Sequence, residues 1–538
     1  MEGSMTQAPR RARRAYLVVA LVALTAAVAP PARAAAPALD WKPCVDAAGF
    51  DCATAAVPRD YSDPKGPQIK LAVTRLPAQD SAHRIGSLFV NFGGPGAPGV
   101  EVVKAIGAGL FGNLNQRFDI VGFDPRGVGE SSPSIDCKIN QETQGIWAQP
   151  FVTPENLDTT GLVSRTNDYI DRCIALNGDI LPYVSTANVA RDMDLLRQAV
   201  GDDKLTYLGF SYGTFLGATY ASLFPHRYRA LVLDGALDAD AYINHPMAAT
   251  REQTAGFERA LGRFLQACAV HQDVCQFGGE DPSNALDELI DRAEQTPIPA
   301  TGDDPRPVTG DDIRAAAIQA VYAKQLWPLL ALSLSLADAG DGVGIRLIVD
   351  FFYGRLPDGT FDPLADRFFT ISALELQYEH DAGTFLDAGA DSWAMFDHFG
   401  WNTGYGELPW GLYTVRPRGI YTGPFKTAAD SPTVLVVGTT YDPATPYRGA
   451  RRLVHELGQA RLLTMRGDGH TAYGGNSNCI DSAVDAYLID LTVPPAGTVC
   501  RQEVPFAVPP LSQARALSTG KEHRFNRVLS RILRSAVD

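Results

Sequence analysis

The sequence feature that most restricts the fold is a serine flanked by glycines and placed between an apolar run and a helical stretch. Residues 205–208 form a short apolar run, Gly-Phe-Ser-Tyr-Gly occupies 209–213, and 214–224 has the composition of a helix. A G-x-S-x-G match alone is weak in a chain with 50 Gly, but a strand before it and a helix after it are typical of a nucleophile elbow. Such a turn lifts the Ser211 hydroxyl to the end of a sheet, beside a helix N-terminus.

Other short apolar runs repeat this strand-like pattern along the chain. They occupy residues 86–92, 118–123, 230–233, 433–437 and 461–465. Between them lie helical stretches such as 188–200, whose apolar residues recur at helical spacing. Short β-branched runs that alternate with helices predict an α/β fold, with a mostly parallel sheet and helices on both faces.

The strand pattern is absent from about 236 to 425, which predicts a large insertion. This stretch contains helical patterns such as Ile313–Leu336 and aromatic-rich loops around 393–413. We therefore predict a mainly helical cap at 236–425, between a first part of the core at 40–235 and a second part at 426–538. The basic tail at 521–534 has helical spacing, and we expect it to form a packed terminal helix.

Residues 1–34 have the pattern of a secretory signal peptide. Four Arg lie between positions 10 and 14, an apolar run covers 16–29, and Ala32-Arg33-Ala34 provides a cleavage site near Ala34. The alternative is a membrane anchor, but the run is short for a span and Pro30-Pro31 ends it. The pair Arg13-Arg14 also suits twin-arginine export. We therefore expect a secreted, extracellular protein without a stable membrane anchor.

The net charge disfavours two classes of partner. The chain has 47 Lys plus Arg against 61 Asp plus Glu, a net charge of −14. Binding to nucleic acid or to an anionic membrane requires a basic surface. We therefore expect neither kind of partner.

All eight Cys follow the predicted signal peptide, and an even count in an exported chain predicts disulfides. Proximity in sequence favours the pairs 44–52, 137–173, 268–275 and 479–500. The alternative is a metal site, for which only Cys268 and Cys275 with His271 between them offer a cluster. No second cluster completes a tetrahedral set of ligands, so disulfides are favoured.

A serine nucleophile needs a base and an acid that orients it, and on this fold both follow the serine in the chain. His470 follows the apolar run 461–465 closely, and Asp442 follows the run 433–437. Asp234 is the competing acid because it also ends a predicted strand. Asp468 lies too near His470 in sequence to be favoured.

The glycine-rich turn after the first apolar run predicts one half of an oxyanion hole. Asn-Phe-Gly-Gly-Pro-Gly occupies 91–96, and the N–H of Gly94 or Gly93 would approach a substrate carbonyl oxygen. The N–H of Tyr212 would provide the second donor. A phosphate cradle is not favoured, because no Gly-Lys-Ser/Thr follows and no G-x-G-x-x-G opens a helix.

Together these motifs resemble the proline iminopeptidase and tripeptidyl aminopeptidase family of α/β-hydrolases. The resemblance covers nearly the whole chain after residue 34, with the cap matching least, and is strongest to the secreted actinobacterial tripeptidyl aminopeptidases. It rests on the motifs at 92–96, 122–131, 209–214, 233–235, 442–446 and 469–470.

The resemblance implies an α/β-hydrolase core with a helical cap, and the release of one to three residues from a free peptide N-terminus. It implies Ser211, Asp442 and His470 as the triad, and Gly94 with Tyr212 as the oxyanion hole. Neither a metal nor an organic cofactor is implied.

The chain departs from the family pattern at two places. Phe92 replaces the His that begins the iminopeptidase glycine motif, which disfavours strict release of proline. Cap positions 371–375 and 407–410 lack the two Cys of the family's Ile-x-Cys-x-Asp/Glu and Cys-x-x-Trp runs. One disulfide is therefore expected to be absent, and the cap to be looser.

Glu375 is the candidate for recognition of the substrate's N-terminus. A carboxylate in the cap would pair with the α-ammonium group and so count residues from that end. Glu379 and Asp381 are rivals, and a solvated charge on a helix surface is the alternative explanation for all three.

Two other functions remain open. A secreted carboxylesterase or lipase-like hydrolase would use the same triad. A binding protein that kept the fold is a third possibility, although the complete order of Ser, Asp and His argues against it. Epoxide and haloalkane hydrolases use Asp at the position of Ser211 and are excluded. The number of residues released and the oligomeric state do not follow from the sequence.

Overall fold

The computed structural model describes residues 1–3, 34–146, 153–154, 157–301 and 305–506. Most of the predicted signal peptide and the predicted terminal helix at 521–534 lie outside these residues. None of the helices in the described ranges combines the length and the apolarity needed to cross a bilayer.

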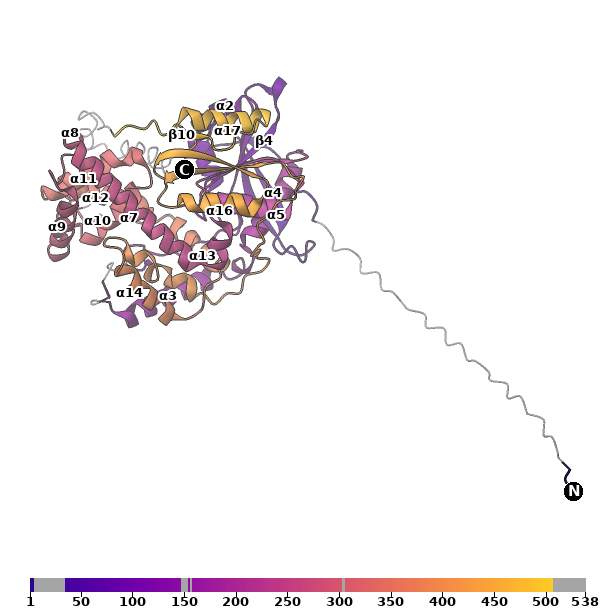
Figure 1. The fold of residues 1–538 in the computed structure, drawn as a ribbon, viewed down its shortest axis with the longest axis horizontal. Coiled ribbons are helices and arrows are strands. Elements are labelled where there is room, and N and C mark those ends of the chain that lie inside the picture. Colours follow the sequence, from indigo (N-terminus) through magenta and orange to yellow (C-terminus); the bar gives the residue numbers. More distant parts are fainter. Residues whose placement is uncertain (4–33, 147–152, 155–156, 302–304, 507–538) are drawn as a thin grey trace. The chain divides into compact units, whose positions relative to one another are not determined.

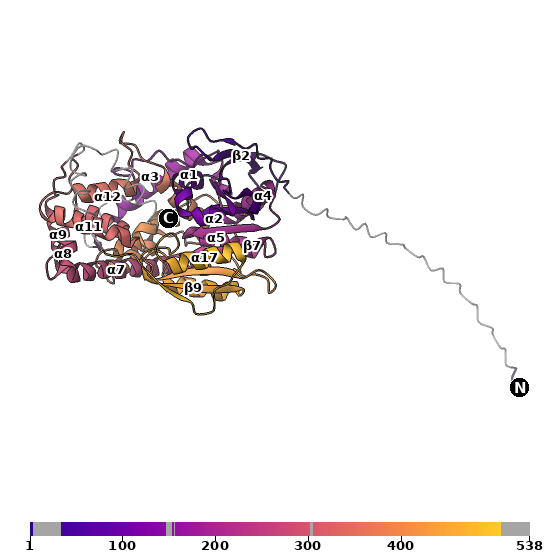
Figure 2. The same ribbon diagram turned by 90° about the horizontal axis from the view of Figure 1, so that it is seen from above.

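The core is one sheet whose strands are mostly parallel, as the sequence predicts (Figures 1 and 2). Among the described residues its order is β1-β2-β3-β5-β4-β6-β7-β8-β9-β10. The pairings that join β1, β2, β3 and β5 are antiparallel, and all those from β5 through β4 to β10 are parallel. The strands are β1 (Lys42–Pro43), β2 (Asp51–Pro58), β3 (Gln68–Leu76), β4 (Gly86–Asn91), β5 (Phe118–Phe123), β6 (Leu205–Phe210), β7 (Tyr228–Asp234), β8 (Val434–Tyr441), β9 (Ala460–Asp468) and β10 (Val499–Arg501).

The central strands β4, β5 and β6 are buried along their whole length, because helices cover both faces of the sheet. Apolar residues of α1 (Gly99–Leu110), α2 (Gly112–Asn115) and α17 (Asn478–Asp490) belong to the core of one face. Those of α4 (Thr186–Ala199), α5 (Tyr212–Leu223) and α16 (Tyr447–Leu457) belong to the core of the other face.

Every strand predicted from an apolar run is present, but β1, β2, β3 and β10 were not predicted. In β3 buried and exposed residues alternate over its first half, so it carries no continuous apolar run. Strand β10 has only three residues. A search for continuous apolar runs therefore overlooks β3, whose alternation is instead the pattern of a half-buried strand, and a strand as short as β10 has too few residues to show a pattern.

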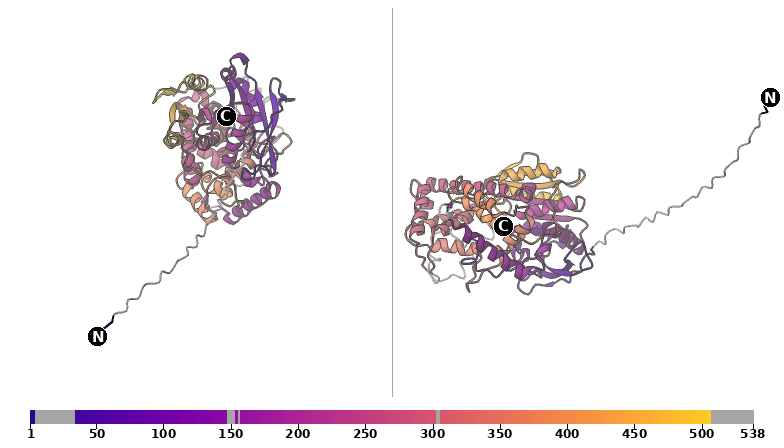
Figure 3. Two further views of the ribbon diagram at one scale, coloured as in Figure 1. Left: turned by 90° about the vertical axis from the view of Figure 1, so that its right-hand side faces the viewer. Right: turned by 90° about the horizontal axis from the view of Figure 1, so that it is seen from below.

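Between β7 and β8 the described residues form helices and no named strand (Figures 1 and 3). We call this region the cap; its bounds at 236 and 425 stay a prediction. Its α-helices are α6 (Ala239–Asn244), α7 (Pro246–Val270), α8 (Gln272–Cys275), α9 (Pro282–Gln295), α10 (Gly310–Ala320), α11 (Trp327–Asp338), α12 (Val343–Tyr353), α13 (Leu364–Glu375), α14 (Ala382–Trp393) and α15 (Leu408–Gly411). Helix α3 (Thr159–Asn177) adds to it, because Leu162 packs with Phe385 and Leu408.

The helical pattern at Ile313–Leu336 is two helices rather than one. Helix α10 ends at Ala320, and α11 begins at Trp327 with Pro328 in its first turn. Proline suits the first turn of a helix but not its interior, because it has no N–H to donate. Residues 321–326, with the short 3₁₀ helix η5 (Lys324–Leu326), form the connection.

The four predicted disulfides are all present. They join Cys44 to Cys52, Cys137 to Cys173, Cys268 to Cys275 and Cys479 to Cys500. The sulfur atoms of the alternative metal cluster are therefore bonded to each other.

Candidate active site

Ser211 lies in a strained turn between β6 and α5. Its φ of 55° and ψ of −124° lie in a region that residues with a side chain rarely adopt. The turn is tight because a Cβ on Gly213 would lie 2.8 Å from both oxygens of Asn91. Ser211 N–H donates to the carbonyl of Asp234 at 2.9 Å, which fixes the turn to the end of β7. This is the geometry of a nucleophile elbow.

His470 and Asp442 form a buried pair at the ends of β9 and β8. Nδ1 of His470 lies 3.0 Å from each carboxylate oxygen of Asp442. The side chains are 2% exposed for His470 and 0% for Asp442. A carboxylate in this position holds the imidazole in one tautomer, with the proton on Nδ1 and the lone pair on Nε2.

The loop after Asp442 fixes its carboxylate. Oδ1 accepts hydrogen bonds from the N–H groups of Ala444 and Thr445, at 2.9 and 2.8 Å. Oδ2 accepts from the Thr445 hydroxyl at 2.9 Å. Because the carboxylate is bound on both oxygens, its orientation toward His470 is set before any substrate arrives.

Ser211 and His470 each contact the turn that follows β7. While Asp234 binds the Ser211 amide, the imidazole packs over Gly235, where an added Cβ would lie 3.0 Å from its Cε1. Nε2 of His470 is buried and makes no hydrogen bond to another described residue. In enzymes without substrate such catalytic hydrogen bonds are often long and form fully only with substrate.

The two competing acids have other partners. Burial raises the pKa of Asp234 to about 6, against the hydrogen bonds that its carboxylate accepts from the N–H groups of Tyr473 and Ala472. Asp468 pairs with Arg263 and Lys324. Of the three acids Asp234, Asp442 and Asp468, only Asp442 forms a hydrogen bond with the ring of His470 in the described residues.

The glycine-rich turn after β4 lies against the nucleophile. A Cβ on Gly93 would stand 2.9 Å from the Cβ of Ser211, and both Gly93 and Gly94 have positive φ. The N–H of Gly93 donates to Asn91 Oδ1 at 3.1 Å. The N–H groups of Gly94 and Tyr212 donate to no other described residue, so this pair is the better candidate for the oxyanion donors.

Phe92, the residue that departs from the iminopeptidase motif, belongs to the core under the nucleophile. Its ring stacks on Phe210 with centroids 5.9 Å apart and planes at 5°. The side chain is buried with Phe111 and Leu208. Its role in this structure is packing under the elbow.

Glu375 is the one buried carboxyl among the three cap candidates. It ends α13 and is 1% exposed, whereas Glu379 and Asp381 are exposed. Oε2 accepts from the N–H of Thr186 at 2.8 Å, and Oε1 has no partner among the described residues. Asp381 caps α14 through Thr384.

Burial raises the pKa of Glu375 to about 7, although hydrogen bonds from Thr186 oppose this. The hydroxyl of Thr186 also lies 2.5 Å from that of Tyr212, the residue after Ser211. Glu375 is therefore linked to the elbow through a single threonine. A buried carboxylate with a free oxygen near a nucleophile can bind a cation.

The positions that lack the two family Cys lie on packed helices. Ala373 is on α13, and Glu407 directly precedes α15. The hydroxyl of Tyr378 donates to Glu407 at 2.5 Å, and the Tyr378 ring stacks on Trp410. Polar and aromatic contacts thus join this part of the cap; whether it is looser stays a prediction.

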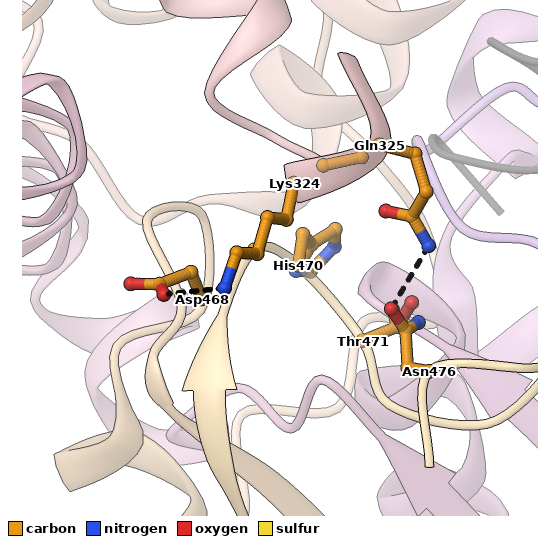
Figure 4. A pocket seen from close by; sticks show the side chains of 8 residues that line it. Lys324, Gln325, Asp468, His470, Thr471 and Asn476 are labelled. Atoms are coloured by element: carbon orange, nitrogen blue, oxygen red, sulfur yellow. Dashed lines mark hydrogen bonds and ion pairs between the residues drawn. The ribbon is translucent and has the colours of Figure 1, made fainter. Parts of the chain in front are cut away.

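The sequence analysis missed a set of cap residues that contact the His470 loop. A small polar pocket lies there, and Figure 4 shows its side chains. The residues that line it are Ala323, Lys324, Gln325, Asp468, Gly469, His470, Thr471 and Asn476. The only sequence signal was the break between α10 and α11, marked by Pro328.

Comparison with known proteins gives relatives along most of the chain. The family described as "TAP-like protein" matches residues 415–500, and the family described as "alpha/beta hydrolase fold" matches 91–278. Serine protease Hip1 of Mycobacterium tuberculosis is 34% identical over 508 residues, which are 90% of this chain and 96% of the relative. Tripeptidyl aminopeptidase of Streptomyces lividans is 32% identical over 475 residues, 85% and 86% of the two chains. Carboxylesterase B of Mycobacterium tuberculosis is 34% identical over 455 residues, 84% and 86% of the two chains.

Proposed function

The chain belongs to the TAP-like family of α/β-hydrolases, and we propose that it is a secreted serine exopeptidase that releases short peptides, tripeptides above all, from free N-termini. Its relatives make it a serine peptidase of the α/β-hydrolase type. The observation that supports the proposal most is the buried Asp442–His470 pair beside the strained turn of Ser211.

The proposed reaction begins with attack of Ser211 Oγ on the scissile carbonyl carbon, while Nε2 of His470 takes the hydroxyl proton. The N–H groups of Gly94 and Tyr212 stabilise the oxyanion of the tetrahedral intermediate. The intermediate collapses to an acyl-enzyme as His470 protonates the leaving amine. Water then attacks the acyl carbon with His470 again as base, which releases the short peptide and restores Ser211. In this scheme the protein supplies the first nucleophile, the base and the oxyanion donors, and water is the second nucleophile.

The exopeptidase part of the proposal rests on Glu375. Its free Oε1 is buried, and its other oxygen is tied through Thr186 to Tyr212. An α-ammonium group bound at Oε1 would fix how far the substrate's N-terminus lies from Ser211. An N-acylated substrate has no such charge and would lose this ion pair.

Export is the second part of the proposal. It rests on the sequence pattern of residues 1–34 and on four disulfides, which persist in oxidising compartments. We expect cleavage near Ala34, by the general or the twin-arginine route.

The test is hydrolysis of Ala-Ala-Ala and Ala chromogenic amides by the purified mature protein, each with a free and an N-acylated terminus. We expect cleavage of the free tripeptide amide, and a loss of at least about 10³-fold in kcat in Ser211→Ala. Full activity in Ser211→Ala would refute the mechanism. Equal cleavage of free and acylated amides would refute the exopeptidase specificity and leave the triad intact.

A carboxylesterase is the second candidate, because the relative named carboxylesterase B has the same 34% identity to this chain as Hip1, over a shorter matched length of 455 against 508 residues. The same triad hydrolyses esters. A kcat/KM for short-chain esters far above that for the free tripeptide amide would favour this function.

A further inference from the structure

A single arginine of the cap contacts the ends of both strands that carry the Asp442–His470 pair. Arg263 belongs to α7 and donates from Nε and Nη2 to the carboxylate of Asp468, the latter at 3.2 Å. Its guanidinium also lies over the ring of Tyr441, with Cζ 3.6 Å from the centroid. Planar contact with a carboxylate and an aromatic face at once is specific to arginine.

The two residues that Arg263 contacts pair with each other. Tyr441 of β8 faces Asp468 of β9 after an irregularity in the ladder that follows Thr439. Tyr441 directly precedes Asp442, and Asp468 lies two residues before His470. Arg263 therefore holds the ends of β8 and β9, where the loops that carry Asp442 and His470 begin.

A second cap segment holds the same loop from another side. The N–H of His470 donates to the carbonyl of Tyr322 at 2.5 Å, and the Tyr322 ring meets the imidazole edge-on at 5.7 Å. Lys324 Nζ lies 3.7 Å from Asp468 Oδ2, and Gln325 donates to Asn476 at 3.0 Å (Figure 4).

We propose that Arg263 and Asp468 are positioning residues, through which the cap sets the geometry of the Asp442–His470 pair. The inference rests on the proposed triad and adds to it that the cap is part of the catalytic apparatus as well as a cover. Arg263, Lys324 and Asp468 are called the cap clamp below.

The burial of Asp468 makes the clamp effective. Its side chain is 8% exposed, so its charge is costly unless paired, and both cations come from the cap. Loss of Arg263 leaves a carboxylate with one weaker partner at the base of the His470 loop. A displacement of about 1 Å at a catalytic base can cost on the order of 10²-fold in rate.

The clamp also predicts a charge effect on His470, because its cations balance the charge of Asp468. Removal of Arg263 would leave the negative charge of Asp468 less balanced beside His470, and neutralisation of Asp468 would leave the positive charges of Arg263 and Lys324 unbalanced there. The titratable and charged groups around His470 come from β7, β8, β9 and the cap. They are Asp234, Tyr441, Asp442, Asp468, Arg263, Tyr322 and Lys324.

The experiment compares kcat, KM and the pH dependence of kcat/KM in Arg263→Gln, Asp468→Asn and the double variant. The control is Arg452→Gln, which removes another arginine that joins core and cap, here α16 to Asp238 and Glu252. We expect kcat to fall about 10- to 100-fold in each clamp variant, with KM little changed and the control near wild type. In the double variant the losses should not multiply.

The acid limb of the pH profile should move up in Arg263→Gln and down in Asp468→Asn, by on the order of 0.3–1 pH unit. The double variant should return close to the wild-type profile. Arg263→Lys keeps the positive charge but loses the planar guanidinium that stacks on Tyr441 and binds Asp468. Its acid limb should therefore match wild type, and its kcat should lie between those of wild type and Arg263→Gln. A structural role alone would not produce opposite pH shifts.

Two further measurements keep the inference separable from the proposed function. The imidazole of His470 is titrated by NMR in a Ser211→Ala background, which needs no substrate. Labelling of wild type but not Ser211→Ala by a fluorophosphonate tests the nucleophile alone. If labelling depends on Ser211 but the clamp variants match Arg452→Gln in kcat and in the titration of His470, only the clamp inference fails. If Arg263→Gln does not fold, the inference is tested instead by the kcat of Arg263→Lys and by the NMR titration of His470 in that variant.

Discussion

Asp234 binds the main-chain N–H of Ala472 with both carboxylate oxygens, at 3.1 and 3.0 Å. Ala472 lies two residues after His470, and the N–H of Tyr473 adds a third bond at 2.8 Å. Asp442 and Asp234 thus hold the same loop in different ways, since only Asp442 reaches the imidazole. Both end parallel strands at the same edge of the sheet, so strand position alone does not separate their roles.

The first prediction follows from this difference. Asp442→Asn should lower kcat by about 10³- to 10⁴-fold, because an amide stabilises the wrong imidazole tautomer and no imidazolium. Asp234→Asn should keep kcat within about 10-fold and mainly lower stability, by about 1–3 kcal/mol for a buried hydrogen bond lost. Steady-state kinetics and urea unfolding measure the two effects. If the fully folded Asp234→Asn variant lost more kcat than Asp442→Asn, Asp234 would have to be assigned as the catalytic acid instead of Asp442.

The sequence predicts those features of this protein that are determined within short segments of the chain. The elbow at Ser211, the strands β4 to β9 and the four disulfides each follow from patterns within a few tens of residues. Contacts between distant segments do not. Arg263 meets Asp468 across 205 positions, and nothing in the residues around Arg263 marks it among the other arginines of the cap. The burial of Glu375 likewise depends on the packing of α13 against the start of α4.

The second prediction concerns the oxyanion hole. Gly94→Ala should lower kcat by about 10²- to 10³-fold, the usual effect of losing one oxyanion donor. The reason is its φ of +98° and an added Cβ that would lie 2.8 Å from the N of Gly96. Gly458→Ala is the matched control, since it also has positive φ but open space around it. An equal loss in both variants would point to general destabilisation instead.

The third prediction concerns binding by Glu375. A carboxylate whose pKa is raised by burial to about 7 pairs with an ammonium group only above that pH, and a peptide α-amino group is protonated only below about 8. KM for the free tripeptide amide should therefore be lowest between about pH 7 and pH 8. Glu375→Gln should raise this KM at least about 10-fold. The N-acylated amide serves as control, and its KM should respond to neither pH nor substitution.

The same carboxyl should lower the stability of the free enzyme at neutral pH. Its folded pKa of about 7 lies above the ordinary 4.5, so the folded state is favoured below pH 4.5 and loses this advantage as pH rises to about 7. Glu375→Gln should thus raise Tm by a few degrees at pH 8 and by little at pH 4.5. A fall in Tm at pH 8 would show that the charge is satisfied in the free enzyme.

The last prediction concerns a histidine that joins three parts of the cap. Nδ1 of His398 lies 3.0 Å from Glu258 of α7, and Nε2 lies 3.0 Å from Asp287 of α9. Burial opposes a charge on this ring, but the hydrogen bonds and charges of Glu258 and Asp287 outweigh it and raise the pKa of His398 above 6.5. The ring is therefore charged over a wider range of pH in the folded protein than in the unfolded chain.

A raised histidine pKa gives stability that is fully present below pH 6.5 and is lost as pH rises through the folded pKa. His398→Gln should thus lower the free energy of unfolding by about 1 kcal/mol at pH 5.5 and by less at pH 9, as measured by urea unfolding. His226→Gln is the control, because His226 is 61% exposed and only 3.8 Å from an exposed Asp430. A loss in His398→Gln that is the same at both pH values would mean that the ring acts by packing and not by charge.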